Sequence, residues 1–482
     1  MRYLAASLLL ASAAIPAAGQ SGAPSPEIVT EAGKVVAITH VTVVDGTGAA
    51  ARSDQTVILD HSRIVASGAA DRVKIPDDAQ LIDGRGKSLI PGLVGMHEHM
   101  FYASPVAGPP IAIEQFVTAP RLYLASGVTT ARTAGSMDPY GDLELKRGIE
   151  AKRFVGPDLE LSTPYLEGSP PAVPTMHGLT NSDDARRLVR YWRDLGFTSV
   201  KAYADITTDE LAAGIDEAHR LGMKVTGHLC SVGYQQAMAL GIDNFEHGPF
   251  VSPDGDLDSA RKPDLCRRSE GPQTGRAVLG QIATNVSPDA AEVRALVQTM
   301  VRRRVALTST LAVLEGGTGM SASRRARLQG LLHPAVWDYL NQASPERAAR
   351  GALFSQAMRK EMAFERAFVK AGGLLMAGCD PTGDGFTVAG LGDQRNVELL
   401  VDAGFSVPAA IRIATLNGAI FEGKATNLGS IEVGKQADLV LLNGDISRDV
   451  TAIETPRTVF KAGVGFDSAA LYKSVAGQVG LH

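Results

Sequence analysis

The sequence GLVGMHEHM, residues 92–100, places two histidines, His97 and His99, one residue apart in an apolar run that contains glycine. Residues two apart point in widely different directions on a helix, but they share one face of a β-strand. On a strand, both imidazoles could reach one metal ion while Glu98 points to the opposite face. We therefore expect this stretch to be a strand that ends in a pair of metal ligands.

The section from about Pro91 to Lys424 alternates short apolar runs with longer segments of helical pattern, such as residues 182–196 and 208–222. For these two helices we expect N-terminal caps at Ser182 and at Thr208 or Asp209. The strand candidates are LVGMHEH (93–99), VTTARTA (128–134), LELSTPYL (159–166), TSVKAYA (198–204), KVTGHL (224–229), IDNFEHG (242–248), VALTSTLAV (305–313) and GLLMAGCDP (373–381). Eight strand–helix units predict an α/β fold, a (β/α)8 TIM barrel.

The two ends of the chain have a different texture from this middle section. Residues 35–48, 55–70 and 79–92 are rich in β-branched residues broken by turn formers, and the pattern returns in residues 428–445 and 455–466. We expect residues 26–90 and residues 425–482 to build one small β-sandwich domain together. Residues 91–424 are then the barrel.

Residues 1–20, MRYLAASLLLASAAIPAAGQ, contain one positive charge at Arg2, an apolar run and small residues at Ala17, Ala18 and Gly19. This pattern is typical of a secretory signal peptide, so we expect a periplasmic or secreted protein. No later segment reaches about 18 continuous apolar residues, and no membrane span is expected in the mature form. The net charge of -5 and the scattered basic residues do not favour a nucleic-acid partner.

Three widely spaced cysteines, Cys230, Cys266 and Cys379, are an odd count for an exported chain. They do not predict a disulfide framework, and we interpret Cys230 and Cys379 as small buried residues.

Two connections, residues 250–300 and 312–365, are longer than a barrel loop needs to be. Such segments often act as lids over a barrel site. The alternative is that they decorate the outer ring of helices and pack against a second subunit in a homo-oligomer.

Polar residues recur where the expected barrel strands end. Because the carboxyl ends of barrel strands meet at one rim, we expect these side chains to lie together. They are His97, His99, Lys201, His228, His247 and Asp380. Neutral imidazoles and a carboxylate are ligands for zinc and similar divalent ions. A protonated Lys201 would be repelled by a cation, whereas carbamylation by carbon dioxide would turn it into a carboxylate that can bridge two ions.

This order of ligands resembles the amidohydrolase superfamily over nearly the whole mature chain. PGLVGMHEH, the lysine of VKAY and the closing LGSIEVGKQADLVLL are similar to its imidazolonepropionase-like and prolidase-like metal-dependent hydrolases. The chain departs from many members at Gly95, where an acidic residue is common. It departs from some prolidase-like relatives at Cys230, where they carry histidine or tyrosine.

The resemblance implies two divalent ions, expected to be Zn²⁺, held by the six residues with Lys201 as N6-carboxylysine. It also implies hydrolysis of an amide bond in a small substrate such as a dipeptide or an N-acyl amino acid. A metal-bridging hydroxide would attack while Asp380 acts as general base and then acid. The alternatives are a lactone or cyclic amide as substrate, a mononuclear site with unmodified Lys201, and a metal-binding barrel without turnover.

Other rim residues are candidates for contact with substrate. Tyr165 and Tyr203 could donate to a developing oxyanion, and His177 lies in a proline-rich loop on the same rim. Arg132 could hold a substrate carboxylate, or it could pair with a neighbour inside the barrel. By strand alternation, Glu98 and Glu246 should point away from the neighbouring histidines.

Overall fold

A computed structural model describes residues 28–30, 33–104, 111–171, 173, 175–252, 257, 282–315, 320–342, 344–382 and 385–480. The signal peptide expected in residues 1–20 lies outside the described residues. Residues 253–256 and 258–281 of the connection expected over 250–300 lie outside them as well.

All eight expected strands of the middle section are present, and they pair in parallel. They are β7 (Leu93–Glu98), β10 (Val128–Thr133), β11 (Asp158–Glu160), β12 (Ser199–Ala202), β13 (Lys224–Gly227), β14 (Asn244–Glu246), β15 (Ala306–Ser309) and β16 (Leu375–Ala377). The strand order is β11-β10-β7 in one sheet and β12-β13-β14-β15-β16 in the other. Because the strands are parallel, their carboxyl ends lie on the same side.

The edges of these two sheets contact each other. Beyond β11, parallel bridges join Ser162 to Ser199 and Leu166 to Ala202 of β12. At the other edge, the Asp380 amide donates to the carbonyl oxygen of His97 in β7 at 3.0 Å. Gly378 makes this approach possible, since a Cβ there would lie 2.4 Å from the backbone nitrogen of His97. The carboxyl ends of strands from both sheets therefore lie close together.

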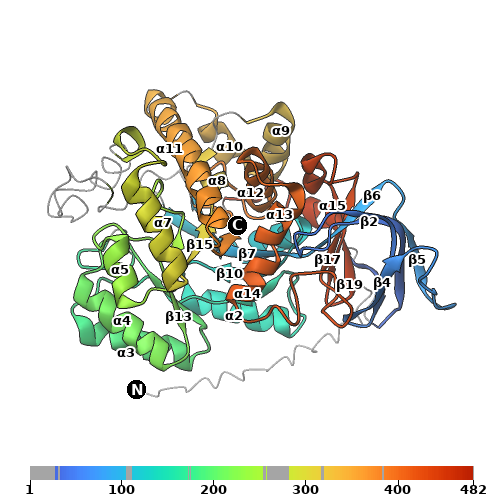
Figure 1. The fold of residues 1–482 in the computed structure, drawn as a ribbon, viewed down its shortest axis with the longest axis horizontal. Coiled ribbons are helices and arrows are strands. Elements are labelled where there is room, and N and C mark those ends of the chain that lie inside the picture. Colours follow the sequence, from blue (N-terminus) through green and yellow to red (C-terminus); the bar gives the residue numbers. More distant parts are fainter. Residues whose placement is uncertain are drawn as a thin grey trace, which may run out of the picture.

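Helices follow the strands and cover them, as a strand–helix alternation requires. They are α1 (Thr118–Ala125), α2 (Pro139–Glu150), α3 (Ser182–Asp194), α4 (Thr208–Arg220), α5 (Tyr234–Leu240), α7 (Ala291–Arg303), α8 (Leu311–Glu315), α9 (Ala322–Leu331), α10 (Pro334–Leu340), α11 (Pro345–Lys370), α12 (Leu391–Asp402), α13 (Val407–Ile413) and α14 (Leu416–Phe421). The caps of α3 and α4 differ by one residue from expectation: Asn181 and Thr207 accept the first amides. The expected connection 312–365 folds into helices α8 to α11, which Figure 1 shows in yellow and orange.

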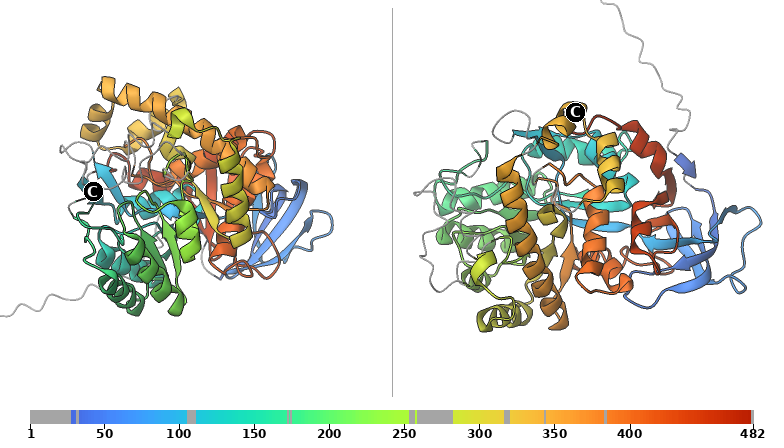
Figure 2. Two further views of the ribbon diagram at one scale, coloured as in Figure 1. Left: turned by 60° about the vertical axis from the view of Figure 1, so that its left-hand side comes forward. Right: turned by 90° about the horizontal axis from the view of Figure 1, so that it is seen from above.

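Strands from both chain ends join one sheet, which lies at the right of Figure 1, where blue strands lie beside red ones. Both further views place it beside the helices rather than among them (Figure 2). Its order is β1-β19-β18-β17-β6-β2-β3-β4, with β5 paired to β2. The two chain ends meet where β6 pairs antiparallel with β17 and where β1 pairs antiparallel with β19. The bounds are β1 (Ile28–Thr30), β2 (Val36–Val43), β3 (Arg52–Asp60), β4 (Arg63–Ala69), β5 (Gln80–Asp83), β6 (Lys87–Pro91), β17 (Leu439–Asn443), β18 (Pro456–Lys461) and β19 (Val464–Asp467).

The remaining elements are β8 (Phe101–Ser104), β9 (Ile111–Glu114), the 3₁₀ helix η3 (Val450–Glu454) and α15 (Ser468–Ser474). None of the helices in the described parts of the chain combines the length and apolar character that a membrane crossing requires.

Candidate metal centre

His97, in β7, and His99, directly after the strand, point to one side, as expected for residues two apart. Both rings meet the carboxylate that follows β16: Nε2 of His97 lies 3.7 Å and Nε2 of His99 lies 3.5 Å from Oδ1 of Asp380. The three side chains are almost fully buried. They form a compact group of potential metal ligands, with one ligand atom from each lying within 4.8 Å of the others.

His247 and His228 lie on the other side of the same carboxylate. Nε2 of His247 is 3.7 Å from Oδ2 of Asp380. The ring centroid of His228 is 4.7 Å from that of His247, and the centroid of His247 is 4.5 Å from that of His97. The two oxygens of Asp380 thus face different histidines.

Two of these residues have a left-handed backbone, which non-glycine residues rarely adopt. His247 has φ = 70° and Asp380 has φ = 48°. Such strain persists where the surroundings impose it, often at functional sites. At Asp380 the hydroxyl of Thr382 helps to impose it by donating to Oδ1 at 2.5 Å.

The histidines are arranged as metal ligands require. Nδ1 of His99 donates to the carbonyl oxygen of Gly135 at 3.1 Å, and Nδ1 of His247 lies 2.6 Å from the Thr310 hydroxyl. Burial lowers the pKa of His247 well below its usual value and that of His228 to about 3, so these rings are neutral. Imidazoles with Nε2 directed at a shared carboxylate fit zinc or a similar divalent ion.

Lys201, on β12, is only 1% exposed. Among the residues that the structure describes, its Nζ atom has no hydrogen-bond partner. Burial lowers the pKa of its amine to about 8, against the opposing effect of the Glu246 and Asp380 carboxylates. Burying a charged amine without a partner costs free energy. The surroundings of Lys201 therefore favour a neutral or chemically modified amine.

Glu246 contacts the site, although strand alternation predicted that it points away. Its Oε2 accepts from Nδ1 of His97 at 2.8 Å. Alternation fails because the left-handed backbone of His247 turns the chain immediately after Glu246, at the end of β14. Glu98 does follow the prediction: its Oε1 accepts from the Cys379 amide at 3.2 Å on the helix side of the strands.

Arg132 lies inside the fold, where one of its two expected roles would place it. It is 1% exposed, and its guanidinium donates to the carbonyl oxygen of Met96 and, at 2.7 Å, to Oε1 of Glu246. This inward-facing residue of β10 has a charge partner inside the fold, and a contact with substrate stays a prediction. The alternative reading, a pair within the barrel, is the one observed.

His177 is not brought to the metal ligands. Its side chain is about half exposed, and Nε2 lies 3.0 Å from Oδ2 of Asp184 in α3. Tyr165 and Tyr203 do lie beside the ligands, since their ring centroids are 4.8 Å apart and that of Tyr203 is 5.2 Å from His228.

A second buried group lies behind the first, on the helix side of β7. It consists of Glu98, Cys379 and Asp393 of α12. The Cys379 thiol donates to Glu98 at 3.0 Å. The carboxylate of Glu98 also occupies the space beside Gly95, where a Cβ would lie 2.5 Å from Oε1. The space that an acidic side chain at position 95 would need is therefore filled by Glu98.

Cys379 is a free buried thiol, as expected. Cys230 is buried, as expected, and it also takes part in a disulfide, which was not expected. An odd cysteine count excludes a fully paired framework, but it leaves room for one bond beside a free thiol.

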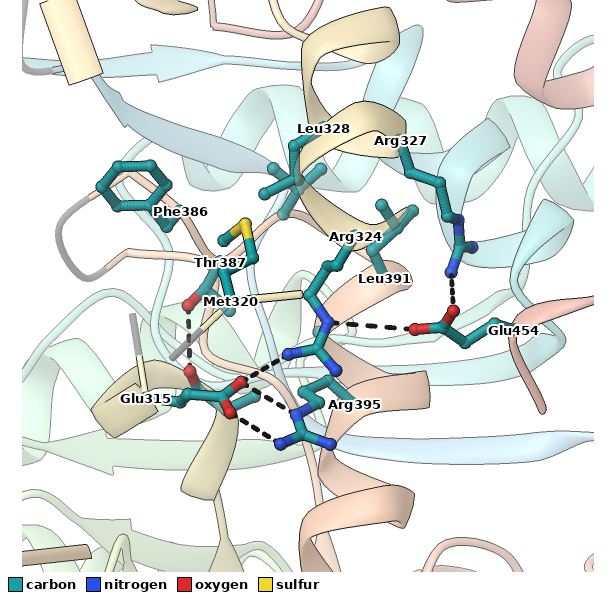
Figure 3. A pocket seen from close by; sticks show the side chains of 13 residues that line it. Glu315, Met320, Arg324, Arg327, Leu328, Phe386, Thr387, Leu391, Arg395 and Glu454 are labelled. Carbon is teal, nitrogen blue, oxygen red and sulfur yellow. Dashed lines mark hydrogen bonds and ion pairs between the residues drawn. The ribbon is translucent and has the colours of Figure 1, made fainter. Parts of the chain in front are cut away.

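A separate shallow pocket lies between the helical connection after β15 and the loop before α12 (Figure 3). Its charged residues pair with one another: Arg395 forms two hydrogen bonds to Glu315 at 2.6 and 2.8 Å, and Arg324 donates to Glu315 at 2.8 Å. None of the six predicted metal ligands lines it. These ion pairs fix the connection to the rest of the fold.

Comparisons with known proteins agree with this arrangement. The family model described as the amidohydrolase family matches residues 88–464. A solved structure of a candidate prolidase from Bifidobacterium longum is 25% identical, covers 92% of this chain and 100% of its own, and superposes with a TM-score of 0.66.

A Xaa-Pro dipeptidase with bound methionine is 19% identical, with 90% and 100% of the two chains covered and a TM-score of 0.66. Phenylurea hydrolase B is 21% identical, with 91% and 98% covered and a TM-score of 0.64. No curated protein matches the chain. The family match covers most of the sequence, and the chain therefore belongs to the amidohydrolase family and is a hydrolase that acts on carbon–nitrogen bonds.

Proposed function

We propose that the protein is a binuclear metal-dependent hydrolase of amide bonds. The observation that carries the proposal is the position of Asp380, whose Oδ1 faces His97 and His99 while Oδ2 faces His247. One divalent ion would be held by His97, His99 and Asp380, and a second by His228 and His247. Zinc suits this set of nitrogen and oxygen ligands.

Lys201 would be the ligand shared by both ions. Its amine attacks carbon dioxide, forms a carbon–nitrogen bond and releases one proton, which leaves a carbamate with a negative charge. The amine's lowered pKa, about 8, and its lack of a partner within the described residues support this modification. The compact group of His97, His99 and Asp380 also supports a second candidate, a mononuclear enzyme with unmodified Lys201.

Bound divalent ions would supply Lewis acidity, which polarises a carbonyl group and lowers the pKa of water. Asp380 is suited to take the proton of the attacking water and to pass it to the leaving nitrogen. The Thr382 hydroxyl donates to its Oδ1 at 2.5 Å, which favours the ionised form. The carboxylate is therefore ionised and able to accept a proton from water. Tyr165 and Tyr203, beside His228, are candidates to donate to the substrate carbonyl.

Dipeptides and N-acyl amino acids are the substrates that we infer. The candidate prolidase and the Xaa-Pro dipeptidase among the similar structures support this class. A lactone or a cyclic amide is the second candidate substrate, since the same metal ligands can serve its hydrolysis as well as that of a linear amide.

We also propose a closed (β/α)8 barrel over residues 91–424, supported by the contacts at both edges of the two sheets. For residues 26–90 and 425–482 we propose a sandwich. Val57 and Leu59 of β3 share a buried cluster with Leu441 and Phe460 from distant positions in the sheet, which supports a sheet that curls over this cluster. The Cys230 disulfide supports export, because disulfides persist in oxidising compartments.

The test is a hydrolysis screen of the zinc-loaded protein against Xaa-Pro and other dipeptides, N-acyl amino acids, cyclic amides and lactones. We expect turnover of dipeptides or N-acyl amino acids, and loss of that turnover in Asp380→Asn. Turnover confined to lactones or cyclic amides would contradict the proposed substrate class, and equal turnover in Asp380→Asn would contradict the catalytic assignment.

A further inference from the structure

The carboxylate of Glu246 is the most heavily hydrogen-bonded group beside the metal centre. It is 0% exposed. Oε2 accepts from Nδ1 of His97 at 2.8 Å. Oε1 contacts Nη2 of Arg132 at 2.7 Å, Nδ2 of Asn244 at 3.1 Å and the hydroxyl of Thr226. Every partner is a donor, so the whole acceptor capacity of this group is directed at fixed side chains.

Arg132 supplies the positive charge that a buried carboxylate needs. Its guanidinium is permanently protonated, and two further hydrogen bonds to the carbonyl oxygen of Met96 fix its position. Met96 directly precedes His97. The same guanidinium therefore ties Glu246 to the backbone of the strand that carries the histidine.

The hydrogen bond to Glu246 determines which nitrogen of His97 is free. Because the ionised Glu246 carboxylate can only accept, the proton of a neutral His97 ring must be on Nδ1. The lone pair of Nε2 is then directed toward Asp380, 3.7 Å away. His99 and His247 have different partners at Nδ1, the carbonyl oxygen of Gly135 and the hydroxyl of Thr310. Of these three rings, His97 alone has a carboxylate behind it, which increases the electron density that its Nε2 can donate.

We propose that Glu246 is a positioning residue: held by Arg132, it fixes the tautomer and orientation of His97 and so sets the affinity of the centre for its first divalent ion. This inference rests on the proposed function. It extends that function beyond the six ligands, to a residue that touches neither substrate nor metal.

The test compares Glu246→Gln with Glu98→Gln. Glutamine keeps the size of the side chain but adds a donor where all partners already donate. Glu98 is the matched control, because it is equally buried and adjacent to both β7 histidines but bonds Cys379 instead. The metal is removed with a chelator, and each protein is titrated with Co²⁺ while visible absorption reports binding.

For Glu246→Gln we expect the dissociation constant of one Co²⁺ ion to rise about 10- to 100-fold, with the other ion and the Glu98→Gln control unchanged. Wild-type affinity for both ions in a folded Glu246→Gln protein would overturn the role of Glu246 and leave the proposed function intact. A wild-type protein that binds no Co²⁺ would overturn the proposed function itself.

A second measurement needs no variant. In ¹⁵N NMR spectra of the metal-free wild-type protein, the His97 ring should carry its proton on Nδ1. A His97 ring protonated at Nε2 alone would overturn the inference even if Glu246→Gln fails to fold.

Discussion

Nε2 of His99 lies 3.5 Å from Oδ1 of Asp380, although the two residues follow the first and the last of the parallel strands in chain order. The contact depends on the pairing of the strand ends, because Asp380 also donates its amide to His97. Through its amide and its carboxylate, this one residue joins the backbone of β7 to histidines from two strands. Its loss should affect chemistry more than folding.

Asp380→Asn should reduce turnover by about 10²- to 10⁴-fold, the usual contribution of a general acid–base group. The amide keeps the shape of the side chain but cannot accept a proton. Initial rates with the best substrate from the screen measure the effect. Asp216→Asn, an exposed carboxylate on α4, is the control and should retain full activity. Comparable rates for both variants would remove Asp380 from the mechanism.

Gly95→Ala should destabilise the fold by about 1–3 kcal/mol through overpacking. The new Cβ would lie 2.5 Å from Oε1 of Glu98, which the Cys379 amide and thiol hold in place. The free energy of unfolding in urea measures the effect. Gly330→Ala is the control: a Cβ there meets nothing within 4 Å, and alanine in helix α9 should be neutral or stabilising by up to about 1 kcal/mol. Equal stabilities of Gly95→Ala and wild type would show that Glu98 can move.

Asp142→Asn should change the pH dependence of stability. Burial raises the pKa of Asp142 from 3.8 to about 7, and the nearby Asp138 adds to this. A raised carboxyl pKa favours the protonated form in the folded state, so its contribution to stability is complete below about pH 4 and is lost as the pH rises through about 7. Asparagine cannot ionise. The stability of the variant relative to wild type should therefore increase across this range, by at most about 4 kcal/mol.

Urea unfolding at several pH values between 4 and 8 measures this difference. Asp183→Asn, an exposed residue in the first turn of α3, should show the wild-type pH dependence. A constant difference between Asp142→Asn and wild type would mean that Asp142 ionises normally in the folded protein.

The regular part of the fold could be predicted from the sequence. Strand periodicity located all eight parallel strands and the residues at their carboxyl ends, because one apolar pattern recurs in each unit. The prediction that His97 and His99 share a face holds for the same reason. It needs only the geometry of an isolated strand.

The side-chain positions that the sequence could not predict depend on irregular backbone and on partners far away in the chain. Glu246 was expected to point away from the site, because alternation assumes an extended chain, and His247 departs from it with φ = 70°. The role of Arg132 was left open between a substrate contact and a pair inside the barrel, because its partner Glu246 lies on a different strand. A buried charge within the strand VTTART was the available signal, since such a residue needs an internal counter-charge.

The measurement that tests the central claim most directly is the metal content of the mature protein expressed with added zinc and bicarbonate, compared with Lys201→Ala. Lys74→Ala, at an exposed position of the β-domain, is the control. The account predicts about two zinc ions per chain in the wild type and the control, and one or none in Lys201→Ala. Two ions in Lys201→Ala, or none in the wild type, would contradict a centre bridged by a carbamylated lysine.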